Sequence, residues 1–393
     1  MKPASLALVS TAALCTVCGA TNRAHAQSSV TLYGTIDTSI TYVNHASGSK
    51  NLWSVSNNSA GDLSGTRWGI KGTEDLGGGL KALFQLENGF DPANGRLNQG
   101  GRLFGRQAFV GLAEDKLGTV TIGRQYDPLI DIVQVITADN YFGSAFATPG
   151  DVDNYDNSFR VSNAVKYTSP SWQGLQLEAM YSFGGIAGST GSGQSYSAAL
   201  AYARGPVSVA AGYFHANNSP ASAGPRDPAA GWNSTADGTF NGPINLGYQT
   251  AHSLGIARVA AQYAAGLFTF GLGYSNSQYR RDGASSFGAN EHYNTGQGFA
   301  NYQLTTAMLI GVGYSYMKAG GDTSATYHQV SAGADYNLSK RTDIYLTAAW
   351  QHASGETGDG LGGAQPAQAS IGSYGYAGTS NQEIVVLGFR HKF

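Results

Sequence analysis

The segments GTVTIGRQY at residues 118–126 and RVSNAVKYT at residues 160–168 have the character of β-strands, and between them lie residues 127–159, DPLIDIVQVITADNYFGSAFATPGDVDNYDNSF. A connection this long between two strands is usually functional or disordered. Its apolar side chains argue against disorder, because they can pack against a neighbouring surface: Ile130, Ile132, Val133, Val135, Ile136, Tyr141, Phe142 and Phe146. We therefore predict that residues 127–159 fold into the lumen of a β-barrel and narrow it.

The composition favours a membrane barrel over a helical membrane protein. Of the 393 residues only 12% are charged, whereas 55 are glycine and 23 are tyrosine. Beyond the N-terminus no run reaches the about 18 apolar residues that a spanning helix needs, and the mean hydropathy is slightly negative. A membrane protein of polar average composition must expose one face of each spanning segment to water, as an all-β barrel does.

The N-terminus has the three parts of a secretory signal peptide. Lys2 supplies the positive charge, residues 6–17 supply the apolar core, and Ala24-His25-Ala26 supplies the small-x-small cleavage site. We predict a signal peptide at residues 1–26, which leaves residues 27–393 as one transmembrane barrel domain.

Both cysteines, Cys15 and Cys18, lie in the predicted signal peptide. The mature chain is therefore expected to contain no disulfide, although it is exported to an oxidising compartment. Loss of Lys2 and Arg23 lowers the Lys+Arg count from 23 to 21 against 25 Asp+Glu, so the net charge changes from −2 to −4. This balance is not that of a nucleic-acid-binding protein.

From residue 30 onward, apolar and polar residues alternate with a period of two. One face of the first segment carries Val30, Leu32, Gly34, Ile36, Thr38 and Ile40, and the other carries Thr31, Tyr33, Thr35, Asp37 and Ser39. This pattern predicts a half-buried strand whose polar face, with Tyr33 and Asp37, lines the lumen. The pattern recurs in sixteen segments, near residues 28–43, 64–74, 78–90, 102–114, 118–126, 160–170, 174–184, 194–204, 206–217, 250–264, 266–279, 292–303, 305–319, 326–337, 341–353 and 380–393.

The connections between these segments alternate strictly between short and long. The short ones are turns such as residues 75–78 and 204–206, in which glycine and proline set the backbone angles. The long ones lie near residues 44–63, 91–101, 127–159, 184–193, 218–249, 280–291, 320–325 and 354–379. An even strand number with short turns on one side and long loops on the other predicts a sixteen-stranded antiparallel transmembrane β-barrel with short periplasmic turns and long extracellular loops.

The last segment ends in Phe393 and has one largely apolar face. Val385, Leu387 and Phe389 share this face, whereas Arg390 and Lys392 lie on the other. An apolar C-terminal strand suits recognition by assembly machinery and closure against the first strand, although an ordinary final strand accounts for the pattern equally well.

Several motifs together resemble the general diffusion porins of Gram-negative bacteria, and the betaproteobacterial branch in particular. They are SVTLYG at residues 29–34, SGTRWGIKG at 64–72, EDLGGGLKA at 74–82, FQLE at 84–87, GRQAFVGL at 105–112, GRQY at 123–126, YTSP at 167–170, ADYNLSKRTD at 334–343 and the terminal Phe393. The likeness runs through the whole mature chain and is weakest in the outer loops.

The resemblance implies a homotrimer of barrels whose third outer loop folds inward to form a constriction, with wall arginines facing loop acids. By matching motifs, the wall candidates are Arg67, Arg102, Arg106, Arg124 and Arg160. Residues 91–101 correspond to a latch that reaches a neighbouring subunit. The candidate acids of the loop are Asp127, Asp131 and Asp139, with Asp151, Asp153 and Asp156 as further possibilities.

The alternation of faces supports only some of these assignments. It places Arg67 with Lys71, and Arg160 with Lys166, opposite apolar neighbours, so all four are expected to face the lumen. Arg124, Arg102 and Arg106 instead share a face with apolar residues. Either a bulge shifts the register there, or those strands lie at a subunit interface. A further alternative is that an individual arginine only pairs with an acid at the base of a loop.

Arginines held across a water-filled gap from carboxylates would produce a transverse field that orients polar solutes. We therefore expect a porin that passes ions and small hydrophilic solutes by passive diffusion, with a weak preference for anions. The alternatives are a substrate-specific outer-membrane channel and, less favoured, a plugged barrel enzyme or adhesin. No catalytic or metal-binding arrangement is evident in the sequence, so we expect no enzymatic activity, no metal and no cofactor.

The expected location is the bacterial outer membrane. The expected partners are outer-membrane lipid and lipopolysaccharide, two further copies of the chain, small hydrophilic solutes and ions, and the barrel-assembly machinery through Phe393. No nucleic-acid partner is expected.

Overall fold

The computed structural model describes residues 29–56, 62–227, 232 and 242–393. The predicted signal peptide at residues 1–26 lies outside these residues. Among the residues described, no helix combines the length and the apolarity needed to cross a bilayer.

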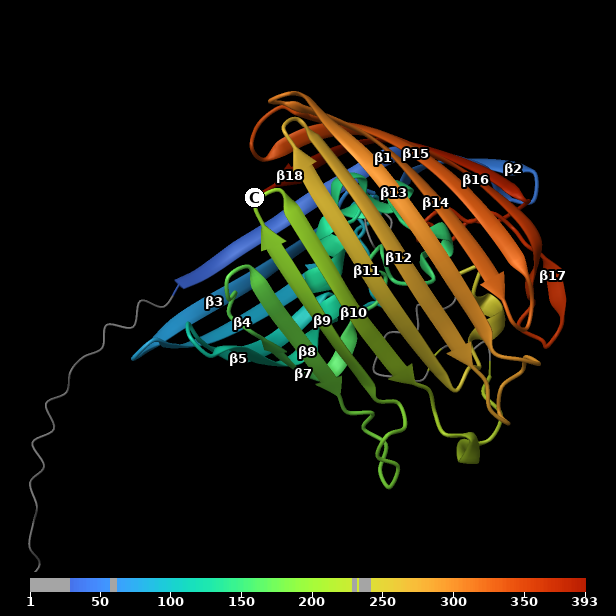
Figure 1. Cartoon of the computed structure of the whole chain (residues 1–393), viewed down its shortest axis with the longest axis horizontal. Coiled ribbons are helices and arrows are strands. Elements are labelled where there is room, and N and C mark those ends of the chain that lie inside the picture. The colour runs from blue at the N-terminus through green and yellow to red at the C-terminus, as the bar shows by residue number, and fades with distance from the viewer. Residues whose placement is uncertain (1–28, 57–61, 228–231, 233–241) are drawn as a thin grey trace, which may run out of the picture.

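Within the described part of the chain, sixteen antiparallel strands form a closed cylinder, as predicted (Figure 1). The cylinder closes at β1 (Ser29–Ser47), which pairs on one edge with β18 (Asn381–Lys392) and on the other with β3 (Arg67–Gly77). The other strands pair in chain order and are β4 (Leu80–Gly89), β5 (Gln107–Glu114), β6 (Gly118–Gln125), β7 (Val161–Thr168), β8 (Leu175–Ser182), β9 (Ser195–Arg204), β10 (Val207–Asn217), β11 (Ser253–Ala265), β12 (Phe268–Arg280), β13 (Glu291–Thr305), β14 (Met308–Gly320), β15 (Ala325–Asn337) and β16 (Thr342–Gly358).

Two further strands lengthen hairpins and do not widen the cylinder. β2 (Lys50–Ser56) pairs with residues 39–47 of β1, on the same edge that pairs with β3 over residues 29–35. β17 (Ala364–Pro366) pairs with the last three residues of β16. Both therefore extend the wall towards the long loops.

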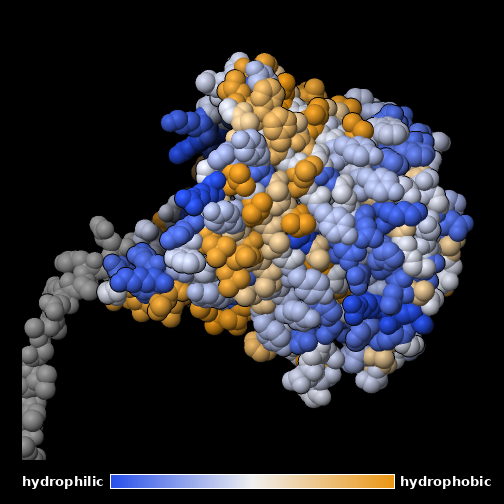
Figure 2. All heavy atoms as spheres, viewed as in Figure 1, coloured by the Kyte–Doolittle hydropathy of each residue, from blue (hydrophilic) through white to orange (hydrophobic). Residues whose placement is uncertain are grey.

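The predicted alternation of faces is confirmed in β1. Val30, Leu32 and Ile40 are 68%, 61% and 56% exposed on the outside, whereas Asp37 is fully buried towards the lumen. Outward apolar residues from many strands form an orange band across the wall, flanked by bluer ends (Figure 2). This band suits contact with hydrocarbon, and the polar inner face suits water.

The connections alternate in length as predicted, with one exception. The turn between β3 and β4 is tight because Gly77, Gly78 and Gly79 all adopt positive φ angles, which glycine tolerates without steric cost. The connection between β14 and β15 was predicted to be long, but it consists of only residues 321–324 and equals a short turn in length.

The strand predicted at residues 102–114 begins later, at Gln107. Residues 90–106 form a loop instead, closed by hydrogen bonds from the amides of Asp91 and Asn98 to the carbonyls of Arg96 and Gly89. Gln99, Gly100 and Gly101 have positive φ angles, which are incompatible with a continuing strand. The prediction that Arg102 and Arg106 belong to a wall strand was therefore wrong.

Residues 126–160 lie inside the cylinder, which confirms the predicted inward loop (Figure 1). The loop contains short helical segments: η1 (Leu129–Val133), η2 (Gln134–Ile136), α1 (Asp139–Phe142), η3 (Gly143–Phe146) and η4 (Pro149–Asp151). Its apolar side chains are mostly buried, as expected for an ordered segment; Val133 and Phe142 are fully buried, whereas Val135 is 49% exposed.

The loop is fixed to the wall on the side of β10, β11, β14 and β15. The amide of Gln329 donates to the carbonyls of Ala145 and Ala147, and Arg258 donates to the carbonyl of Asn154. The ring of Phe142 fits against Gly333, where an added Cβ would come within 2.5 Å of Cδ1 of the ring. The opposite wall, which carries Arg67 of β3, Glu87 of β4 and Arg390 of β18, borders an open space between it and part of the loop.

Candidate pore constriction

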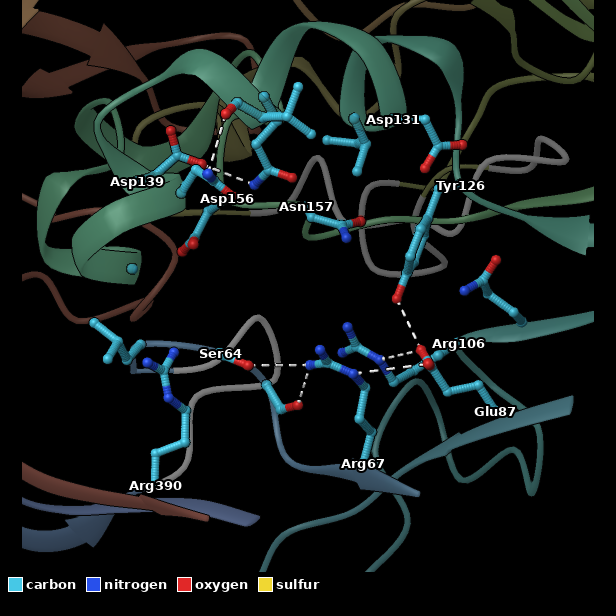
Figure 3. Close-up of a pocket in the computed structure, with 18 of the residues that line it drawn as sticks. Ser64, Arg67, Glu87, Arg106, Tyr126, Asp131, Asp139, Asp156, Asn157 and Arg390 are labelled. Carbon is cyan, nitrogen blue, oxygen red and sulfur yellow. Dashed lines mark hydrogen bonds and ion pairs between the residues drawn. The ribbon is translucent and has the colours of Figure 1, made fainter. Parts of the chain in front are cut away.

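A cavity of about 490 Å³ lies between the inward loop and the opposite wall. Figure 3 shows its two sides, with Asp131, Asp139 and Asp156 projecting from the loop and Arg67, Arg106 and Arg390 from the wall, and an open space between them. The inward loop thus narrows the lumen and places opposite charges across the remaining gap.

The wall side is cationic. Arg67 opens β3, Arg106 immediately precedes β5, and Arg390 and Lys392 end β18, and all four side chains line the cavity. Arg67 donates to the hydroxyl of Ser64 and the carbonyl of Gly65, which hold the guanidinium at the edge of the gap.

Buried carboxylates compensate part of this charge: Asp335 and Asp343 pair with Arg390, and Glu87 of β4 pairs with Arg67 and Arg106. Nε of Arg106 lies 2.8 Å from Oε1 of Glu87, and Nε of Arg67 lies 3.7 Å from Oε2. The hydroxyls of Tyr33 and Tyr126 donate to the same carboxylate at 2.9 and 3.0 Å. Glu87 therefore holds two of the wall arginines in place, since breaking a buried ion pair leaves an uncompensated charge.

The loop side carries three acids that line the cavity, but they are not equally free. Asp131 forms an ion pair with Lys166, which also contacts Glu178. Asp139 accepts hydrogen bonds from Thr137 and Gln134, and Asp156 accepts one from Ser373. Burial raises the pKa of Asp139 to about 6 and the pKa of Asp156 to about 7.

The predicted wall arginines divide into three groups. Arg67 and Arg106 line the cavity. Arg124 and Arg160 are buried behind it: Arg124 donates to the carbonyl of Gly105 and the hydroxyl of Ser162, and Arg160 lies 5.3 Å from the centre of the Tyr126 ring. Arg102 is exposed, donates to the carbonyl of Gln99, and does not line the cavity.

A bulge, one of the two alternatives, is present, but its extra residue lies in β7 and not in β6, the strand of Arg124. Between Gly123 and Gln125, the one residue of β6 lies opposite two residues of β7 between Val161 and Ala164, whereas the pairing of β5 with β6 continues regularly through Arg124. Within the bulge, Asn163 has a φ of 55°. The bulge reverses the expected face of Val161, which is buried against the loop, but leaves Lys166 facing the lumen as predicted.

Among the predicted loop acids, Asp131 and Asp139 line the cavity but Asp127 does not. Asp127 is fully buried and accepts hydrogen bonds from the amide of Leu129 and the side chain of Asn154. It therefore stabilises the first turn of the loop.

The other predicted pore-lining residues point into the barrel without all reaching the cavity. The Nζ of Lys71 lies 5.1 Å from the centre of the Tyr33 ring. Asp37 accepts hydrogen bonds from the amides of Leu63 and Ser64 and from the hydroxyl of Tyr345, so it anchors the segment that lines the cavity at residues 63–65.

Sequence reasoning missed the cavity residues Glu87, Arg390 and Lys392. For Arg390 and Lys392 the orientation follows from the alternation in the sequence: both lie on the face opposite Leu387 and Phe389, just as Arg67 lies opposite its apolar neighbours. The same test, applied to the last strand, identifies both residues.

Comparisons with known proteins agree with this architecture. A family model described as Gram-negative porin matches residues 10–356. An outer membrane porin protein of Bordetella pertussis is 31% identical over 376 residues, covering 83% of this chain and 90% of that protein. Outer membrane porin protein 32 of Delftia acidovorans is 29% identical over 401 residues, covering 96% and 97%.

Among solved structures, the fold is similar to that of an anion-selective porin from Comamonas acidovorans. The TM-score is 0.69 at 24% sequence identity, over 93% of this chain and 100% of that chain. This likeness concerns the fold, while the family match and the sequence relatives establish the membership. The chain therefore belongs to the Gram-negative porin family of outer-membrane diffusion channels.

Proposed function

We propose that this porin is a general diffusion pore that passes ions and small hydrophilic solutes and weakly prefers anions. The main support for this proposal is that one side of the cavity is cationic and faces acids on the loop. The cationic residues are Arg67, Arg106, Arg390 and Lys392. Arginine stays ionised at any accessible pH, whereas burial moves the pKa of Asp139 and Asp156 towards neutrality. We therefore expect the positive side to dominate, although Glu87 compensates part of it and Arg390 pairs with Asp335 and Asp343. The related Comamonas acidovorans porin, described as anion-selective, adds support.

The lining of the cavity favours a general pore over a substrate-specific channel. Among the side chains that line the described cavity, Tyr126 is the one aromatic ring. A dedicated sugar channel would present a series of aromatic surfaces along which the solute slides. Charged and amide groups, which orient any polar solute, prevail here instead.

We propose further that the pore works as a homotrimer in contact with outer-membrane lipid and lipopolysaccharide, and that it acts as a channel and not as an enzyme. The trimer proposal is supported by a largely aliphatic outer face on β1, β5 and β6, including Val30, Val110 and Ile122. Phe393 exchanges two backbone hydrogen bonds with Gly34 and closes the barrel. The assembly machinery is proposed to bind this terminal strand before closure.

Single-channel recording of the purified protein in a planar bilayer tests the proposal. We expect stepwise conductance in groups of three equal steps, without block by low concentrations of any one solute. Block by a single sugar or organic acid at low concentration would show a substrate-specific channel. Absence of channels together with ester or peptide hydrolysis would show a plugged barrel enzyme.

A further inference from the structure

Asp131 differs from the other two acids on the loop side of the cavity. Its side chain is 31% exposed, whereas Asp139 and Asp156 are buried. Asp139 and Asp156 accept hydrogen bonds from hydroxyl and amide groups, but the partner of Asp131 is a cation, Lys166. Asp131 is therefore the loop acid that gains most access to the ion path if it loses its partner.

Lys166 belongs to the wall behind the loop. It lies in β7, and its side chain is only 9% exposed. Its Nζ donates to the carbonyl of Tyr126 at 3.2 Å and lies 3.3 Å from Oε1 of Glu178 in β8. The third contact of the ammonium group is the carboxylate of Asp131. Lys166 thus holds Asp131 against the wall, close to the point where the loop leaves β6.

Glu178 keeps Lys166 in this position. The side chain of Glu178 is 4% exposed and accepts a hydrogen bond from the hydroxyl of Thr168. Thr168 lies directly opposite Glu178 in the pairing of β7 with β8, so Lys166 and Glu178 are diagonal neighbours on the inner face. A buried pair of this kind stays together, because separating it leaves an uncompensated charge.

The contact with Lys166 determines where the charge of Asp131 lies. An ionised carboxylate without a partner is most stable in water, and the nearest water-accessible space is the cavity that Asp131 already lines. Figure 3 shows Asp131 on the loop side of this space, with Arg67 and Arg106 on the other. Without Lys166 the carboxylate is expected to turn into the gap, where it would attract cations and repel anions.

We propose that Lys166 is a positioning residue for ion selectivity. By holding Asp131 against β7, it keeps one carboxylate away from the ion path and so preserves the anion preference. Lys166 acts through Asp131 and does not contact the permeating ion. This inference rests on the proposed diffusion pore and identifies a residue behind its lining that sets its selectivity.

The test is a charge-balanced variant that combines Lys166→Gln with Glu178→Gln. It removes one positive and one negative charge from neighbouring positions, so the net charge stays the same while Asp131 loses its partner. If the carboxylate moves about 3 Å closer to the ion path, the ratio of anion to cation permeability should fall about threefold at about 0.1 M salt. Loss of the two wall charges without this movement should change the ratio by less than about 1.5-fold. The reversal potential across a planar bilayer in a salt gradient measures the ratio.

Two additional variants show whether Asp131 carries the effect. Adding Asp131→Asn to the charge-balanced variant should return the ratio to the parent value or above it, because the released carboxylate is then absent. Lys166→Arg keeps the positive charge and should behave like the parent. If the charge-balanced variant does not fold, Lys166→Gln alone serves instead: it should lower the ratio at least as much, and Asp131→Asn should reverse most of the fall.

The matched control is Lys81→Gln with Asp115→Asn, an exposed ion pair with 2.9 Å between Nζ and Oδ1 that does not line the cavity. It should keep the parent ratio. The proposal would be overturned if the ratio in the charge-balanced variant fell no further than the two removed charges explain, or if the fall persisted after Asp131→Asn. The sign of the parent potential is a separate result. A parent that prefers potassium refutes the proposed anion preference, whereas a further shift towards potassium in the variant still supports the role of Lys166.

Discussion

Replacing Glu87 by glutamine is expected to make the pore more anion-selective, because it removes the one buried carboxylate that compensates Arg67 and Arg106. For an ion about 6 Å from the lost charge in a water-filled gap, the Coulomb energy is about 0.7 kcal/mol. Screening at about 0.1 M salt lowers it to roughly 0.4 kcal/mol. Anions gain this energy and cations lose it, so the ratio of anion to cation permeability should rise about fourfold.

The same substitution is expected to destabilise the barrel. Arg106 is 4% exposed and loses its charged partner, and breaking a buried pair in this way costs about 3–5 kcal/mol. Glutamine keeps an acceptor for Tyr33 and Tyr126, so the lower end of this range is expected. Denaturant unfolding of the reconstituted protein measures the loss.

The assay for selectivity is the reversal potential across a planar bilayer in a salt gradient. The matched control is Glu74→Gln, because Glu74 is exposed and lies seven residues further along β3 than Arg67, roughly 24 Å away. An E87Q protein that folds and conducts but keeps the parent permeability ratio would refute the idea that the wall charges border the ion path.

Three further predictions concern the loop and the wall. Lowering the pH from 7.5 to 5 should strengthen the anion preference, because the pKa values of Asp139 and Asp156 are raised to about 6 and about 7, so both acids become neutral in this range. The reversal potential should respond less to pH in a variant with both residues changed to asparagine. A shift of the preference towards cations on acidification would contradict this prediction. Phe142→Ala should destabilise the protein by about 3–5 kcal/mol and increase the noise of the single-channel current, since the ring fixes the loop against Gly333. An unchanged current trace together with an unchanged melting temperature would count against this role of Phe142. Arg106→Gln should reduce the anion preference, whereas Arg102→Gln should leave reversal potentials unchanged, because only the former side chain lines the cavity; equal effects of the two changes would contradict the assignment.

The barrel could be predicted from the sequence because its pattern is local. In β1 the alternation of residues such as Val30 and Asp37 determines which side chains face outward and which face the lumen. The inward course of residues 127–159 was equally predictable, since a long loop with Phe142 and Val133 needs a surface to bury them. Both inferences use only periodicity and hydrophobicity.

The constriction was harder to predict because it depends on irregular backbone. The alternation of faces fails in β7 at Asn163, whose positive φ angle accompanies an extra residue relative to β6, so Val161 could not be placed by counting. The separate positions of Arg102 and Arg106 depend on where the preceding loop ends, which the turn at Gln99 decides. Hydrogen bonds between residues far apart in the chain could not be predicted either, because nothing in the sequence links Glu87 to Tyr126, which the fold brings together.

The ion preference depends on which side of the loop-narrowed gap dominates, the cationic wall or the largely buried acids of the loop. The most direct measurement is the zero-current potential of the unmodified protein between two potassium chloride solutions of different concentration. We predict a potential of the sign set by chloride, with a permeability ratio modestly above unity. A potential of the sign set by potassium would show that the loop carboxylates, and not the arginines, dominate the path.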